Sequence, residues 1–214
     1  MTIRMVPIED FYPFIAPVAG EVPDFLIRQM LAATAADLCQ RAHCLTTDVD
    51  FVGKADKADY VIPIPTNLEP ETIRYVYVDG LEVSPVKLDT LSRRYHRADW
   101  AELTGTPRSY VMKDKRTITL VPCPVNDCTI RVVAYASVIR NAIELPYQFF
   151  SDYLDVLVEG TLSRIYRVAG QPFSNSQLAN VCSMRYESLM KDVQNEAVRD
   201  FSRSAGHVEF NRII

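Results

Sequence analysis

The spacing of apolar residues changes twice along the chain and divides it into three stretches. In the first stretch, from Pro23 to about Ala42, apolar side chains recur every three or four residues in an alanine-rich run, which predicts a helix. Pro23 followed by Asp24 is typical of a helix start, because proline lacks the donor that a first turn leaves unpaired. We therefore expect the first helix to begin at this pair.

In the second stretch, from Leu45 to Ile139, β-branched and aromatic runs alternate with turn residues, which predicts strands. Asp79-Gly80 between two such runs is a strong signal for a two-residue hairpin, and residues 113–116 predict another tight turn. A short helix over about residues 90–100 interrupts the strands, with Asp89 placed to cap it. We therefore expect a β-rich insertion domain over residues 45–144.

In the third stretch, after Leu145-Pro146, the helical period returns in two stripes, from Phe150 to Val168 and from Leu178 to Phe201. The stripes predict two long C-terminal helices, the last over about residues 175–203. The fold class expected is α+β: a helical bundle of the N-terminal helix and the two long C-terminal helices, carrying the β-rich insertion. The helical domain would comprise residues 23–44 and 145–206.

Both ends of the chain are apolar and lie outside these domains. Residues 1–22 contain Pro7, Pro13 and Pro17, which disfavour a regular helix or a central strand, so we expect an extended arm. Residues 207–214 form a C-terminal tail that folds back onto its own core, docks on another chain or is disordered, and the sequence leaves these alternatives open. The candidate interface residues of the two ends are Phe11, Tyr12, Phe14, Ile15, Val208, Phe210, Ile213 and Ile214.

The composition is that of a folded protein: 214 residues, 48% hydrophobic and 23% charged. We find no apolar run of about 20 residues and no leader pattern, so we expect a soluble product that is not exported and has no membrane partner. The formal net charge of −4 argues against a protein that grips nucleic-acid phosphates over a broad surface.

The sequence offers weak support for catalysis or for a metal. His43, Cys44, Cys123 and Cys128 could supply four zinc ligands, but four residues separate the last two thiols where structural zinc sites mostly use two. We expect reduced cysteines that pack as small hydrophobic residues, with no metal and no cofactor. No nucleophile, phosphate-loop or dinucleotide motif is present, so we do not expect an enzyme.

Several short motifs, taken in their order, carry a resemblance to a known family. They are Ile15-Ala16-Pro17-Val18, Val22-Pro23-Asp24-Phe25-Leu26-Ile27, Trp100, Gly105-Thr106-Pro107-Arg108-Ser109-Tyr110, Ile118-Thr119-Leu120-Val121-Pro122-Cys123-Pro124, Leu145-Pro146, Glu159-Gly160-Thr161-Leu162-Ser163-Arg164-Ile165 and Gly170-Gln171-Pro172-Phe173-Ser174. With them, residues 13–203 resemble the head-to-tail adaptor (neck or connector) proteins of tailed bacteriophages, related to the tail tubular protein A group. Phe173 and Thr161 depart from that pattern, where tryptophan and alanine are common.

The resemblance implies a structural protein of the virion neck, made in the host cytoplasm and assembled as a ring, usually a dodecamer, between the portal protein and a tail or nozzle protein. Double-stranded DNA would pass through the ring without sequence-specific binding. By the same analogy, Val208, Phe210, Ile213 and Ile214 would enter a groove on the portal, and residues 13–18 would lie on an adjacent subunit.

An alternative is a ligand- or carbohydrate-binding module of a phage tail appendage. Its sugar-stacking residues would be Tyr75, Tyr77, Tyr95 and Trp100. Tyr75 and Tyr77 share a strand face because side chains alternate along a strand, but β-branched neighbours would bury that face equally well.

Overall fold

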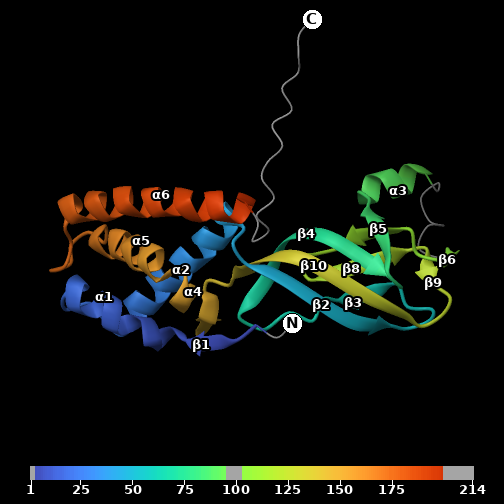
Figure 1. Ribbon diagram of the computed structural model, residues 1–214, viewed down its shortest axis with the longest axis horizontal. Coiled ribbons are helices and arrows are strands. Elements are labelled where there is room, and N and C mark those ends of the chain that lie inside the picture. The colour runs from blue at the N-terminus through green and yellow to red at the C-terminus, as the bar shows by residue number, and fades with distance from the viewer. Residues whose placement is uncertain (1–2, 95–102, 200–214) are drawn as a thin grey trace, which may run out of the picture.

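The computed structural model describes residues 3–94 and 103–199, and these form two lobes arranged end to end (Figure 1). The helical lobe contains α1 (Tyr12–Ala19), α2 (Asp24–Ala42), α4 (Tyr147–Ser151), α5 (Leu154–Tyr166) and α6 (Ser176–Arg199). The sheet lobe contains β2 (Thr46–Gly53), β3 (Asp59–Val61), β4 (Leu68–Val78), β5 (Leu81–Pro85), α3 (Leu88–Arg94), β6 (Thr104–Gly105), β7 (Ser109–Met112), β8 (Thr117–Val121), β9 (Cys123–Pro124) and β10 (Cys128–Val138). Two short strands, β1 (Met5–Pro7) and β11 (Glu144–Pro146), pair antiparallel beside the helices.

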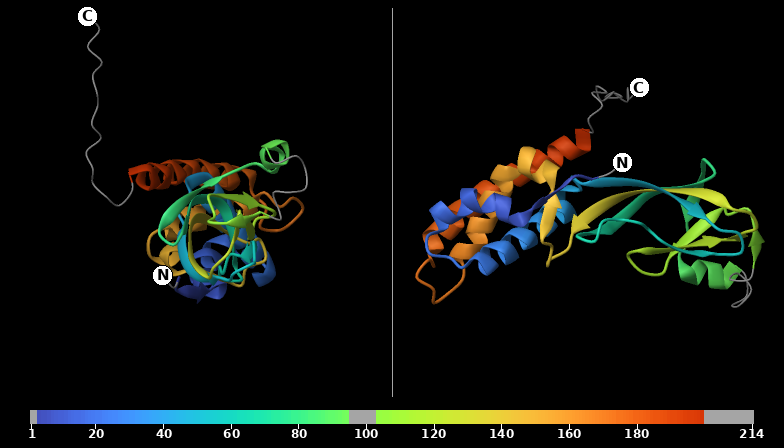
Figure 2. Two further views of the ribbon diagram at one scale, coloured as in Figure 1. Left: turned by 90° about the vertical axis from the view of Figure 1, so that its right-hand side faces the viewer. Right: turned by 90° about the horizontal axis from the view of Figure 1, so that it is seen from below.

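The sheet lobe is built on one curved, seven-stranded sheet with the strand order β2-β10-β4-β5-β7-β8-β3. Its neighbouring strands are antiparallel except β5 and β7, and the end view in Figure 2 shows how far the sheet curls. Two register shifts between β10 and β4, at Val133/Ala134 and at Tyr135/Ala136, leave Arg74 and Glu71 as extra residues on β4. Such bulges increase local twist and bending, which helps the sheet to curl.

The predicted hairpin at Asp79-Gly80 is confirmed. Val78 pairs with Leu81, and both turn residues adopt positive φ, 50° and 79°, as a tight two-residue hairpin with matching twist requires. The turn predicted over residues 113–116 is also present, closed by the Lys113 amide donating to the Thr117 carbonyl over 3.0 Å.

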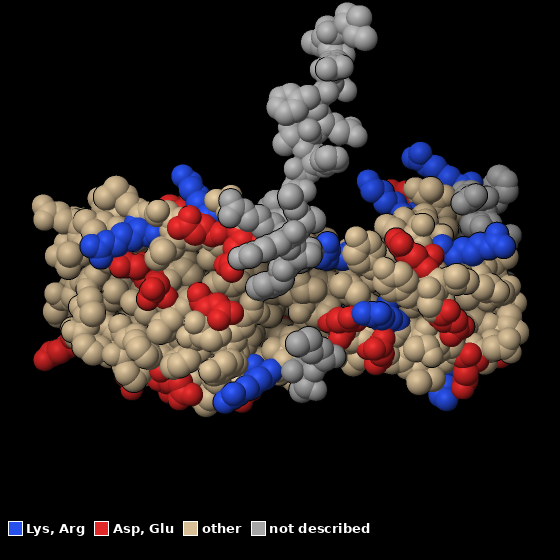
Figure 3. Space-filling view, viewed as in Figure 1, with Lys and Arg blue, Asp and Glu red and all other residues tan. Residues whose placement is uncertain are grey.

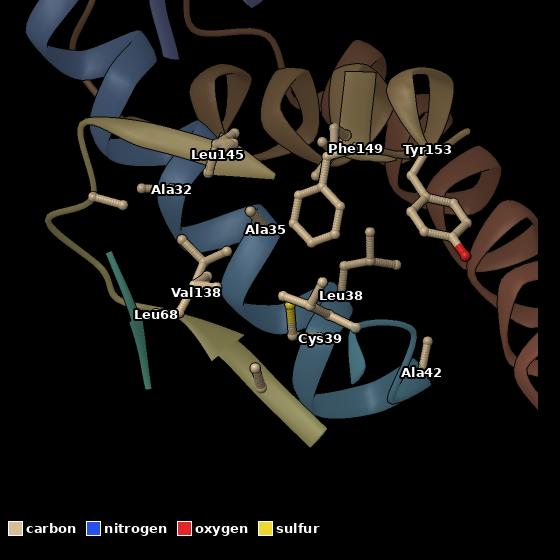
Figure 4. Close-up of a cluster of buried hydrophobic side chains, with 14 of the residues drawn as sticks. Ala32, Ala35, Leu38, Cys39, Ala42, Leu68, Val138, Leu145, Phe149 and Tyr153 are labelled. Atoms are coloured by element: carbon tan, nitrogen blue, oxygen red, sulfur yellow. The ribbon is translucent and has the colours of Figure 1, made fainter. Parts of the chain in front are cut away.

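The two lobes share one core, which Figure 4 shows at their junction. The C-terminal half of α2 brings Leu38 and Cys39 against Val138 at the end of β10 and Leu68 at the start of β4. Phe149 of α4 fills the other side of the same cluster, and all five side chains are almost completely buried. Because this core is continuous, the position of the sheet lobe on the helices is fixed by close packing.

The predicted bundle with two long C-terminal helices is wrong. The stripe from Phe150 to Val168 is divided, since α4 ends at Ser151, and α5 begins at Leu154 and stops at Tyr166 after 13 residues. The Asp152 amide donates to Gln148 and closes α4, and Tyr153 leaves the helical conformation with φ −121° and ψ 18°. The apolar spacing runs across this break without a sign of it. The chain is an α+β protein in which mostly short helices pack beside a strongly curved seven-stranded sheet.

The extended arm expected over residues 1–22 is also wrong for its described part. After β1, residues Ile8–Phe11 form a 3₁₀ turn and Tyr12–Ala19 form α1. Pro13 lies in the first turn of α1, where a missing N–H breaks no helical hydrogen bond, and Pro17 lies inside this two-turn helix. Burial of Phe11 and Ile15 stabilises a helix that its sequence disfavours.

Candidate functional site

The four predicted interface residues at the N-terminal end fall in different environments. Phe11 and Ile15 are completely buried in the core of their own chain, so they are not free to contact a neighbour. Tyr12 is half-buried, and its hydroxyl donates to the Asp24 carbonyl over 3.1 Å. Phe14 is the exception, because 43% of its surface is exposed.

Phe14 belongs to an aromatic cluster that the sequence analysis missed. Its ring lies 5.8 Å from that of Phe150 in an edge-on arrangement, and the Phe150 ring is 6.3 Å from that of Tyr147. The Arg4 guanidinium lies 4.3 Å above the exposed Tyr147 ring. The run Tyr147-Gln148-Phe149-Phe150 was the available signal, since it places three aromatic residues in four positions; of these three, only Phe149 is completely buried.

A second exposed apolar surface lies along α6. Leu178, Val181 and Met184 follow at steps of three residues and expose 43%, 38% and 68% of their surfaces. Residues at this spacing lie on one side of a helix, so they form a strip, which we call the α6 strip. A monomer gains nothing from leaving such a strip in water, which makes it a candidate contact with another chain.

Beneath the exposed surfaces, a polar network fixes α2, α5 and α6 relative to one another. The Asp37 carboxylate accepts hydrogen bonds from Tyr186 over 2.6 Å and from Arg164 over 3.0 Å, and Arg41 lies 3.7 Å from it. Burial, followed by the hydrogen bond to Asp37, raises the pKa of Tyr186 above its ordinary value. Arg41 also forms a paired contact with Glu187 at 2.8 and 2.6 Å. This network gives the helical lobe a rigid frame for its exposed surfaces.

The residues that were weighed as zinc ligands do not form a common site. His43 caps the end of α2 and stacks on Tyr135 at 4.7 Å, whereas Cys123 and Cys128 lie in β9 and at the start of β10. Within residues 3–94 and 103–199 we find no group of three histidine, cysteine or acidic residues that could hold a metal ion. The cysteines of the described chain are unpaired thiols, and four of the five are buried.

The tyrosines of the sugar-binding alternative form an incomplete platform. The rings of Tyr75 and Tyr77 lie 6.1 Å apart and are tilted by 32° to each other, with Tyr75 exposed and Tyr77 half-buried. The Arg74 guanidinium lies 5.5 Å from the Tyr75 ring centre. Tyr95 and Trp100 lie outside the described residues. The pair is as well explained by packing along one strand face as by ligand binding.

The remaining predicted interface residues, Val208, Phe210, Ile213 and Ile214, lie outside the described residues.

On the face seen in Figure 3, basic and acidic side chains are interspersed, and no extended basic patch forms on it. Among the described helices, none combines the length and the apolar character needed to cross a bilayer.

The comparison with known proteins agrees with the expected class of protein. No curated protein matches the chain. A sequence model of one family, described as SU10 adaptor protein, matches residues 9–208 and so includes both lobes. Because the match covers almost the whole length, the chain belongs to the SU10 adaptor protein family.

Proposed function

We propose that this protein is a head-to-tail adaptor that assembles as a ring between the portal and the tail of a phage and forms part of the DNA conduit. Membership of the SU10 adaptor family indicates a structural adaptor role in a phage, and hence a virion component. The ring, its twelve-fold copy number, the portal contact and the relation to tail tubular protein A are parts of our proposal. The observation that carries it is the family match from residue 9 to residue 208.

Two exposed surfaces of the helical lobe fit contacts with neighbouring copies. The aromatic cluster around Phe14 and Tyr147 projects from α1 and α4, and the α6 strip lies on α6. The Asp37 network holds α6 against α2 and α5 beneath the α6 strip. In the aromatic cluster, Phe150 packs edge-on against the completely buried Phe11. The net charge of −4 suits a conduit, since a strongly basic surface would hold DNA phosphates instead of letting them slide.

The C-terminal tail is our proposed attachment to the portal. Val208, Phe210, Ile213 and Ile214 make this segment more apolar than a terminus without a partner would be. When such a segment binds in a groove of another protein, it loses conformational entropy. Burial of these four apolar side chains would offset that loss.

The test is assembly with the purified portal ring, followed by negative-stain electron microscopy and mass measurement. The full-length chain should add to the portal as a closed ring, and a chain that lacks residues 207–214 should fail to attach while its melting temperature shifts by no more than a few degrees. Replacing Glu209 and Asn211 by alanine leaves the apolar residues in place and should preserve attachment. Attachment of the truncated chain at full strength would contradict the role of the tail, and a chain that never binds a portal would contradict the adaptor function.

A further inference from the structure

The seven-stranded sheet contains a gap where a strand is missing. Between β4 and β7 lies β5, but β5 is short: it pairs with β4 only at Val76–Val78 and with β7 only at Ser84 and Pro85. After Pro85 the chain leaves the sheet for α3. Beyond Pro85, no described strand lies between β4 and β7 in the order of the sheet.

This gap is an open cleft of about 700 Å³ with mainly apolar walls. One wall is β4 from Pro70 to Ile73, the opposite wall is β7 from Tyr110 to Met112, and residues 85–88 form the end where β5 leaves. Among the described strands, the part of β4 that precedes Val76 pairs with β10 on one side and has no strand partner on the side of the cleft. The cleft therefore offers both apolar walls and an unpaired strand edge.

The far end of the cleft is held closed by side chains. Lys115 contacts Glu69 at 2.6 Å, and the Arg116 guanidinium donates to the Leu68 carbonyl. These contacts hold the β7–β8 turn against the start of β4.

The C-terminal segment of the same chain is well placed to reach this cleft. Near its end, α6 brings Glu196 and Ala197 to a hollow that Arg74 of β4 also lines, and Arg74 directly follows the cleft residue Ile73. Figure 1 shows the end of α6 over the junction of the lobes, on the side of β4. Seven residues, 200–206, separate the end of α6 at Arg199 from the tail, and they reach about 23 Å when extended, at about 3.3 Å per residue.

The sequence of the tail is suited to strand addition. Val208 and Phe210 alternate with Glu209 and Asn211, which is the pattern of a strand with one apolar and one polar face. Main-chain hydrogen bonds to the edge of β4 would supply binding, and the apolar walls would take the Val208 and Phe210 side chains.

We infer that, before assembly, residues 207–214 occupy the cleft between β4 and β7 as an added strand, and that the portal must withdraw them. The cleft thus stores the apolar tail and protects the free chain from premature association. This inference goes beyond the adaptor function, because it concerns the isolated chain.

The first experiment compares the full-length chain with a chain that lacks residues 207–214 by hydrogen–deuterium exchange, without a portal. Among residues 71–74 and 111–112, the amides that do not donate to β10 or β8 should exchange at least tenfold more slowly in the full-length chain, because an added strand hydrogen-bonds or covers them. Equal exchange at these positions would overturn the inference.

The second experiment titrates a labelled peptide of residues 205–214 into both chains and follows its fluorescence anisotropy. The peptide should bind the truncated chain and bind the full-length chain at least tenfold more weakly, because the attached tail competes at a high effective concentration. The same peptide with alternate amides N-methylated keeps its side chains but cannot pair as a strand, and it should not bind. Equal binding to both chains, or by both peptides, would overturn the inference.

Two substitutions provide a matched pair in the sheet lobe. Ile73→Glu in the cleft wall should abolish peptide binding, whereas Leu81→Glu at an exposed position of β5 should leave it unchanged.

Mass measurement over a range of protein concentrations distinguishes a tail docked in the cleft of its own chain from a tail docked in the cleft of a second copy. Protection that is independent of concentration supports docking within one chain, and protection that disappears on dilution, together with a dimer, would overturn it. Portal attachment is measured separately, so either proposal can fail alone.

Discussion

Tyr186 links α6 to the Asp37 carboxylate of α2, and its ring is almost completely buried. Replacing Tyr186 by phenylalanine keeps the ring and removes the donor of a 2.6 Å hydrogen bond to a charged acceptor. We expect the free energy of unfolding to fall by about 1.5–3 kcal/mol, the usual value for such a bond, as measured by urea denaturation.

The control is Tyr75→Phe, which removes a hydroxyl from an exposed tyrosine outside this network. We expect it to change the free energy of unfolding by less than about 0.5 kcal/mol. Equal effects of the two substitutions would show that the Asp37 network adds nothing to the packing of the helices.

Gly160 of α5 lies where no side chain fits. A Cβ atom there would lie 2.5 Å from Cγ2 of Thr34 and 2.6 Å from the Tyr186 ring. Gly160→Ala should therefore lower the free energy of unfolding by about 1–3 kcal/mol through overpacking, although alanine is the better helix former. Ser188→Ala on the exposed side of α6 is the control and should be neutral or slightly stabilising; a stabilising Gly160→Ala would contradict the close packing.

The environment of a single residue could be predicted only where residues close to it in the sequence determine that environment. A glycine in the middle of a helix indicates a close neighbour but not which one, and at Gly160 the neighbours are the side chains of Thr34 and Tyr186. The start of the last helix was predicted at about residue 175. In the structure Asn175 caps α6, because its Oδ1 accepts hydrogen bonds from the amides of Gln177 and Leu178. Long-range partners such as Thr34 are brought together by the fold, which no local pattern records.

Among the elements, the β4–β5 hairpin depends on its turn. Gly80 has φ 79°, a conformation that costs other residues about 1–2 kcal/mol, and the turn is tied to β10 by the Thr129 amide, which donates to Asp79 Oδ1 over 2.8 Å. Gly80→Ala should lower the free energy of unfolding by about 1 kcal/mol in chemical denaturation. Gly80→Asn should cost less, because asparagine tolerates positive φ; equal costs would mean that the turn conformation does not limit stability.

Elements with a clear local code were predictable, and elements stabilised from outside were not. α2 and the Asp79-Gly80 hairpin follow from the helical period and from turn chemistry. α1 contradicts its own proline content because burial against the rest of the helical lobe compensates for it. The break at Asp152 and Tyr153 was hidden because the apolar spacing of α4 continues in phase into α5.

For the molecule as a whole, ion pairs set the response to acid. The hydrogen bond from Arg41 lowers the pKa of Glu187, and the hydrogen bonds from Lys113 and then Thr119 lower the pKa of Asp59. A carboxyl whose pKa is lower in the folded state stabilises the fold above its unfolded value, near 4, and this contribution is lost as the pH falls through the folded value.

We therefore expect the free energy of unfolding to decrease as the pH falls from about 5 to 3, as measured by urea denaturation at each pH. Glu187→Gln should make this decrease less steep, because the substituted side chain no longer titrates. Glu21→Gln, at an exposed carboxyl outside these pairs, is the control. A decrease that is unchanged in Glu187→Gln would contradict a role for the Arg41 pair.

The candidate site was predictable only in part, because the apolar character of a residue does not say whether its own chain buries it or leaves it exposed. Phe11 and Phe14 look alike in the sequence, yet Phe11 is in the core and Phe14 is on the surface. The cleft between β4 and β7 has no sequence signal, since it arises from where β5 ends relative to its neighbours.

The chain enters the sheet lobe along β2 and leaves it along β10. These two strands are paired, and Thr46 at the start of β2 lies opposite Tyr135 near the end of β10. Its two ends are therefore close enough to be joined by a short loop. In evolution, such a lobe can be enlarged, reduced or exchanged as one piece, while the chain of the helical lobe keeps its course. Related adaptors could thus retain one helical frame and vary the part that the sheet lobe presents.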